Sequence, residues 1–178
     1  MTINVYLPIK TKANITQGTK SDKEGSHRLF KEAKFDDTYS VDFDLTIGTS
    51  VYAVLNGIVE EVIDIHKGNY TGSDWKKGYK AYLKTNYIII KHENKIYSLY
   101  HHLKYEGAAV KKGQRVKSGQ LIGYSGNTGW SIRPHLHFSL FKKQKSRIRK
   151  TISFRFIDYN KSLEDKYYTV KRRKLSEA

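Results

Sequence analysis

Short runs of β-branched and aromatic residues recur along this chain with a period of two, while the spacing typical of amphipathic helices is scarce. The clearest runs are residues 50–54, 57–63, 87–90 and 95–100. Residues 87–91 and 95–100 are separated by His92-Glu93-Asn94, which predicts a tight hairpin. The expected fold is therefore mainly β and antiparallel, with few or no helices.

The composition favours one compact domain. Apolar residues make up 38% of the 178 residues, which is enough for a core, and no Ser/Gly/Pro linker divides the chain. We therefore expect a single domain over residues 1–178. The absence of cysteine excludes disulfides, cysteine-ligated zinc and a cysteine nucleophile. No apolar stretch approaches the roughly 20 residues of a membrane-spanning helix, and no signal peptide is seen in the N-terminal MTINVYLPIK.

The charge is strongly positive, because 33 Lys+Arg stand against 17 Asp+Glu to give +16. This balance predicts anionic surroundings: nucleic acid, acidic lipid, or a polymer such as a bacterial cell wall. Basic residues concentrate at 142–150 and 171–174, where we expect a solvated edge and tail rather than a dedicated binding patch. Residues 64–86 are polar and rich in Gly and Lys, which predicts an insertion loop that walls a cleft.

Two of the seven histidines, His135 and His137, alternate with Leu136 and Phe138 in a predicted strand. Their rings should share one face while the apolar side chains face the core. Such a pair can bind a metal or divide metal binding and proton transfer between its members. It is equally compatible with a polar outer face that has no chemical role.

The other histidines give weaker indications. In His101-His102, adjacent strand residues point to opposite faces, so only one is expected to enter a given site. His66 and His92 lie in a loop and at a turn, where a surface position without a role in chemistry is expected.

A carboxylate partner is found in the run Val41-Asp42-Phe43-Asp44-Leu45. Its apolar residues form one face, and Asp42 and Asp44 share the other. A carboxylate beside a histidine cluster would complete a mixed nitrogen and oxygen zinc site with an open fourth position. The alternative is that Asp42 or Asp44 only pairs with Lys or Arg in this basic protein.

Taken together, several blocks in a fixed order resemble the lysostaphin-type, or LytM, zinc metallopeptidases of bacterial peptidoglycan. The resemblance covers roughly residues 14–141, leaving 142–178 as a basic C-terminal extension, and ordered blocks are far more specific than one His-x-His. It implies an open β-barrel-like core in which the glycines of 113–129 make tight turns. The blocks are 39–43, 48–53, 56–59, 100–103, 110–120 with 122–123, 125–130 and 134–138.

By position, the resemblance implies that Asp42 and His137 are zinc ligands and that His102 and His135 are the two catalytic histidines that do not bind zinc. Members of the family usually place their first ligand histidine four residues before the aspartate, where this chain has Thr38. His27, fifteen residues before Asp42, is the one upstream histidine, and we expect it to supply the third ligand.

The resemblance implies a zinc-dependent endopeptidase, with one Zn²⁺ per chain, that acts on peptide bonds of peptidoglycan. The substrate implies an extracytoplasmic location, and the charge suits anionic wall polymers or lipopolysaccharide. A second hypothesis, motivated by Thr38, is an inactive LytM-type module that binds a cell-wall hydrolase or the wall itself. Nucleic acid is not the expected partner, since the sequence has no helix-turn-helix or zinc-finger module.

Overall fold

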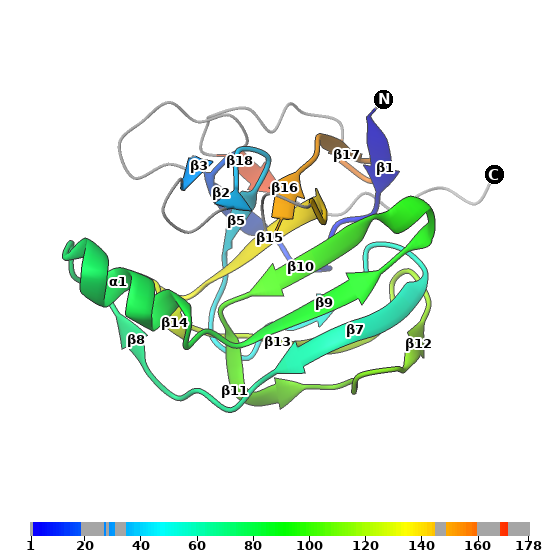
Figure 1. Ribbon diagram of the computed structural model, residues 1–178. Coiled ribbons are helices and arrows are strands. Elements are labelled where there is room, and N and C mark those ends of the chain that lie inside the picture. Colours follow the sequence, from blue (N-terminus) through cyan, green and yellow to red (C-terminus); the bar gives the residue numbers. More distant parts are fainter. Residues whose placement is uncertain are drawn as a thin grey trace.

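The computed structural model describes residues 2–18, 27, 29–30, 35–144, 149–159 and 168–170. Strands dominate this part of the chain, as the period-two runs predict, and the main sheet has eleven strands (Figure 1). All its pairings are antiparallel except that of β16 with β4. Its main path runs through β12 (Arg115–Val116), β7 (Gly57–Ile63), β9 (Tyr87–Lys91), β10 (Tyr97–His101), β15 (His135–Lys142), β16 (Arg149–Thr151), β4 (Phe35–Asp36) and β3 (Leu29–Phe30).

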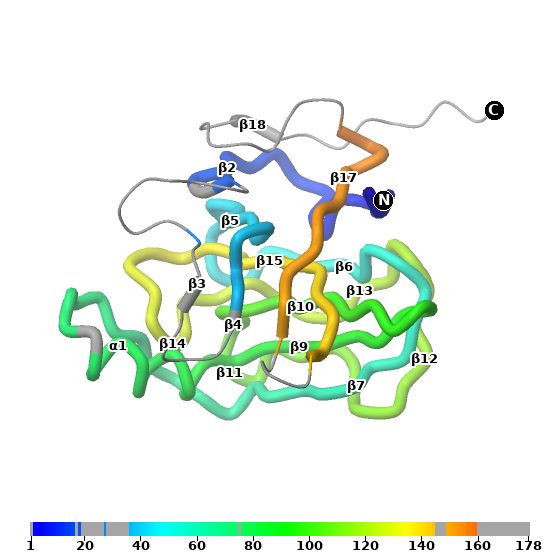
Figure 2. The backbone as a smooth tube through the Cα atoms, turned by 45° about the horizontal axis from the view of Figure 1, so that its top comes forward, coloured from blue at the N-terminus to red at the C-terminus, as the bar shows by residue number. Residues whose placement is uncertain are grey.

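A branch of the same sheet leaves β15 on the edge that β16 also uses, opposite β10. It consists of β5 (Val41–Asp44), β2 (Ala13–Gln17) and β18 (Tyr168–Val170), in that order. A second sheet joins β11 (Leu103–Ala108), β13 (Leu121–Ser125) and β6 (Ser50–Tyr52). Two parallel pairs complete the strands: β1 (Ile3–Val5) with β17 (Phe154–Phe156), side by side in Figure 2, and β8 (Asn69–Tyr70) with β14 (Gly129–Trp130).

The core lies between the main sheet and the three-stranded sheet. Ile88 and Ile90 of β9 are fully buried in the same cluster as Val51 of β6 and Ile122 of β13. Ile89, which points to the opposite face of β9, packs on a smaller cluster of Tyr97, Leu99 and Phe141. Alternate residues of one strand thus serve two apolar clusters, as expected for a pleated strand covered on both faces.

The hairpin predicted between residues 87–91 and 95–100 is present as β9 and β10, joined through the 3-10 turn η1 (Glu93–Lys95). The surface position expected for His92 is wrong, since this side chain is buried. Its Nδ1 donates to the Asn56 carbonyl at 2.8 Å, which leaves Nε2 to accept from the Ser98 hydroxyl at 2.8 Å. His92 therefore fastens the hairpin to the neighbouring turn.

The insertion at residues 64–86 contains the helix α1 (Trp75–Tyr82), which the sequence analysis did not predict. Asp74 caps its first turn by accepting from the backbone N–H of Lys77 at 3.1 Å. Gly78 lets the helix approach β14, because a Cβ at this position would lie 2.6 Å from Cδ2 of Trp130. The helix is short and glycine-interrupted, so it is stabilised by this packing more than by helix propensity.

Segments on both sides of residues 14–141 contribute to the core. Val5, Leu7 and Ile9 before it, and Phe154 and Phe156 after it, belong to the main buried cluster. In the basic run 142–150, the lysines at 142 and 143 are exposed as expected, but Arg149 is buried, which corrects the solvated edge predicted there. Residues 145–148 and the basic run 171–174 lie outside the described residues. Within the described part, no helix is long and apolar enough to cross a membrane.

Candidate metal centre

Strand register places His137 beside Asp42. The two are direct cross-strand partners between β15 and β5, and His137 is also paired with His101 of β10 on the other edge. Val41 and Phe43 turn into the core, whereas Asp42 points to the opposite face. The alternation that predicted a carboxylate and a histidine facing away from the core is therefore present in the structure.

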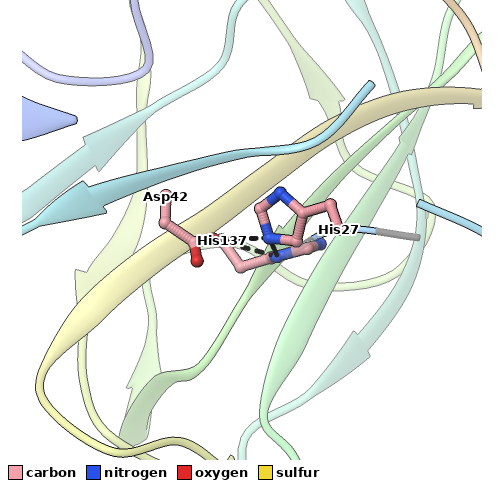
Figure 3. A group of neighbouring side chains, drawn as sticks. All are labelled: His27, Asp42 and His137. Atoms are coloured by element: carbon pink, nitrogen blue, oxygen red, sulfur yellow. Dashed lines mark hydrogen bonds and ion pairs between the residues drawn. The ribbon is translucent and has the colours of Figure 1, made fainter. Parts of the chain in front are cut away.

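His27 completes a cluster of three ligand-type side chains, all buried (Figure 3). Its Nδ1 donates to the carbonyl of Ser40 at 3.1 Å, so Nε2 faces the other two side chains. Nε2 lies 3.2 Å from Asp42 Oδ1 and 3.1 Å from His137 Nδ1, and His137 Nδ1 lies 3.0 Å from Asp42 Oδ1.

These three atoms form a nearly equilateral triangle with edges of 3.0–3.2 Å. Zinc bonded to nitrogen and oxygen in a tetrahedral site separates its ligands by about 3.3–3.5 Å, as follows from the usual bond lengths. A small outward shift of the side chains thus accommodates the ion, and the donor set fits zinc. Thr38 contributes no atom to the cluster and lies in the turn closed by the Ser40 N–H donating to the Asp37 carbonyl.

The electrostatics of the cluster also suit a cation. Burial alone would raise the pKa of Asp42, but the neighbouring His27 and His135, with hydrogen bonds from His137 and His27, hold this pKa well below its usual range. Burial alone would lower the pKa of His27, and the Asp42 carboxylate outweighs this effect and raises it. A metal ion would replace the proton that His27 shares with Asp42, so binding should release protons.

His102 and His135 lie beside the cluster with their ring centroids 4.5 Å apart. His102 Nδ1 donates to the Thr128 carbonyl at 2.7 Å, and His135 Nδ1 donates to the Arg133 carbonyl at 2.8 Å. In the neutral ring each Nε2 is therefore unprotonated and able to accept a proton. His135 Nε2 lies 3.8 Å from Asp42 Oδ2, so it points toward the three-residue cluster.

The expectation that only one of His101 and His102 enters the site is wrong. Both are buried, and the His101 ring lies 4.9 Å from that of His102 and 5.7 Å from that of His137, between centroids. The reason is local: His102 has φ of +61° and interrupts the strand between β10 and β11, so simple alternation does not apply to it.

Sequence reasoning missed a buried ion pair, formed by Asp37 and Arg149, next to His137. Arg149 Nη2 donates to both carboxylate oxygens of Asp37, at 2.9 and 3.0 Å, and to the Tyr82 hydroxyl at 2.8 Å. Burial alone would raise the pKa of Asp37, but the Arg149 guanidinium lowers it below its usual range. The residues come from a turn, the basic run and α1, and no spacing rule links such distant segments.

Comparison with known proteins places this chain in one family. Residues 36–149 match the model of peptidase family M23, and the chain belongs to this family. The matched range contains Asp42, His102, His135 and His137, whereas His27 lies before it.

Two characterised relatives have similar sequences. The peptidoglycan DD-endopeptidase ShyA of Vibrio cholerae is 39% identical over 99 residues, which are 56% of this chain and 19% of ShyA. Lysostaphin of Staphylococcus staphylolyticus is 39% identical over 102 residues, which are 56% of this chain and 18% of that protein. The aligned region thus spans less than a fifth of either relative.

Solved structures support the same fold. A zinc-containing peptidase from Vibrio cholerae is 29% identical with a TM-score of 0.54, covering 85% of this chain and 39% of the other. Lysostaphin from Staphylococcus simulans is 29% identical with a TM-score of 0.52, covering 78% of this chain and 47% of the other. The mainly β, LytM-type architecture expected from the sequence is confirmed.

Proposed function

We propose that this chain is a zinc-dependent endopeptidase that hydrolyses peptide bonds of bacterial peptidoglycan. The observation that carries the proposal is the triangle of His27 Nε2, Asp42 Oδ1 and His137 Nδ1, with two further histidines presenting Nε2 atoms beside it. Three protein ligands and an open fourth position are the arrangement of catalytic rather than structural zinc sites. Membership of family M23 and the endopeptidase relatives support the same assignment.

Bound at these three atoms, zinc supplies Lewis-acid chemistry, in which a scissile carbonyl is polarised and a water molecule is made more acidic. The protein's own part is proton transfer. His102 is the general base, because burial lowers its pKa and keeps the ring neutral, while the bond from Nδ1 to the Thr128 carbonyl leaves Nε2 available. His135, anchored by the Arg133 carbonyl, then stabilises the oxyanion or protonates the leaving amine.

The location and wider contacts follow from the proposed substrate. A peptidoglycan endopeptidase works outside the cytoplasm, and the net charge of +16 favours contact with anionic wall polymers or lipopolysaccharide. Such contact is electrostatic, so binding to intact cell walls should weaken as salt is raised.

The test is zinc content per chain together with peptide release from purified peptidoglycan, for the wild type, His27→Ala and a control, His66→Ala. His66 lies outside the three-residue cluster, so its variant should keep one zinc and full activity. His27→Ala should lose both. A wild type that takes up no zinc when it is supplied would refute the proposal and favour an inactive module that binds a hydrolase or the wall.

A further inference from the structure

The buried pair of Asp37 and Arg149 lies on the side of His137 that faces away from Asp42. Asp37 is 3% exposed and Arg149 is 7% exposed. Besides the two bonds from Arg149, Asp37 Oδ1 accepts from the Ser40 hydroxyl at 3.2 Å. Tyr82 of α1 shares Arg149 Nη2 at 2.8 Å, so the guanidinium is fixed from two directions.

A buried ion pair alone is weak evidence for a stabilising role, since desolvation offsets much of its attraction. Here the acid also has an unusual neighbour. His137 Nε2 is buried with no hydrogen-bond partner among the described residues, and Asp37 Oδ1 lies 3.9 Å from it. His137 is therefore flanked by two carboxylates: Asp42 beside Nδ1 and Asp37 near Nε2.

The tautomer of His137 connects this pair to the metal. A ring that binds zinc through Nδ1 must carry its one remaining proton on Nε2. Histidine ligands of zinc usually donate that second N–H to a carboxylate, carbonyl or water, which fixes the ring and makes it a better ligand. Asp37 is the carboxylate on that side, and a closure of less than 1 Å would bring it within hydrogen-bond reach.

We propose that Asp37, oriented by Arg149, is a positioning residue for His137. Its carboxylate accepts a hydrogen bond from the Nε2–H group of His137 and so strengthens zinc binding at Nδ1. This role rests on the proposed function. Two segments outside the three-residue cluster then help to orient Asp37: the basic run through Arg149, and the insertion helix through Tyr82, which is bonded to Arg149. The geometry excludes Asp37 as a replacement for the missing ligand at Thr38, because it lies near the wrong nitrogen of His137.

The test is the zinc dissociation constant of the full chain, measured by competition with a chromogenic chelator. Asp37→Asn keeps the size of the side chain but removes the anionic acceptor, and it should weaken zinc binding about 10- to 100-fold. Because this variant removes the carboxylate that faces the buried Arg149 guanidinium, which is costly, stability is measured in parallel by urea unfolding of the metal-free protein.

A double variant, Asp37→Asn with Arg149→Met, separates positioning from folding. Removing both charges should restore much of the unfolding midpoint, since hydrophobic replacements of buried pairs are well tolerated, yet zinc binding should stay weak. Zinc binding as tight as in the wild type, in either variant, would overturn the role of Asp37 and leave the proposed function intact. A wild type that binds no zinc would overturn both.

Discussion

Gly129→Ala should destabilise this protein more than an alanine at any ordinary turn. Gly129 has φ of +81°, and a Cβ added there would lie 2.7 Å from Cβ and 3.1 Å from Cα of Thr85, which is buried. Rotation of the threonine side chain cannot relieve contacts with its own Cβ and Cα, so the backbones must separate. The matched control is Gly113→Ala, where φ is +84° but nothing lies within 4 Å of the new Cβ.

The two variants share the cost of a left-handed alanine, about 1–2 kcal/mol. Gly129→Ala adds overpacking of a tight contact, about 1–3 kcal/mol, for a total of about 2–5 kcal/mol. With a urea dependence of about 2 kcal/mol per M, the midpoint should fall by roughly 1–2.5 M for Gly129→Ala and 0.5–1 M for Gly113→Ala.

The assay is urea unfolding followed by tryptophan fluorescence, with both variants and the wild type stripped of metal so that bound zinc does not add stability. Gly129 follows Thr128. The Thr128 carbonyl accepts a hydrogen bond from His102 Nδ1, and its hydroxyl donates to the Leu103 carbonyl. We therefore also expect peptidase activity to fall in Gly129→Ala and not in Gly113→Ala. Equal midpoints for the two variants would refute the argument that the approach to Thr85 is rigid.

Three further predictions concern the site. His102→Ala should keep its zinc but lose activity by about 10²–10⁴-fold, whereas Asp42→Ala and His137→Ala should lose both; full activity without the His102 ring would remove it from the mechanism. Burial, with help from the neighbouring His135 and His137, holds the pKa of His102 well below its usual value. A base must be neutral, so the acid limb of kcat/KM should have its midpoint below about pH 6.5, the ordinary histidine value, and a midpoint above it would contradict the assignment. Finally, a chelator should lower the Tm and added zinc should restore it; a Tm indifferent to both would mean that the three side chains bind no ion.

The parts of the site that lie within strands were predictable from the sequence. A period of two predicts that Asp42 and Phe43 project from opposite faces of their strand, and that His137 and Leu136 do the same. Pairing of the two strands then places Asp42 and His137 side by side. The prediction failed where the backbone departs from the extended form. His102 is left-handed, so the rule that separated it from His101 did not hold.

Contacts between distant segments were beyond the reach of local patterns. His27 reaches the cluster across fifteen residues of sequence, and only the resemblance to a family, not spacing, made it a candidate. Arg149 stood in a run of basic residues where composition predicts solvent, and its burial depends on Asp37, more than a hundred residues earlier. Such pairs are decided by tertiary packing, which single-sequence patterns do not encode.

At His137 the strand β15 is paired on both edges, with β5 beside Asp42 on one side and with β10 beside His101 on the other. A peptide therefore cannot join the sheet beside Asp42 and His137 as an added strand, the main-chain mode of recognition that many peptide-binding domains use. It must cross over the face from which the side chains project. Selection among peptide bonds then depends on the side chains and loops that border this face, so relatives with the same sheet can differ in substrate by changing those borders alone.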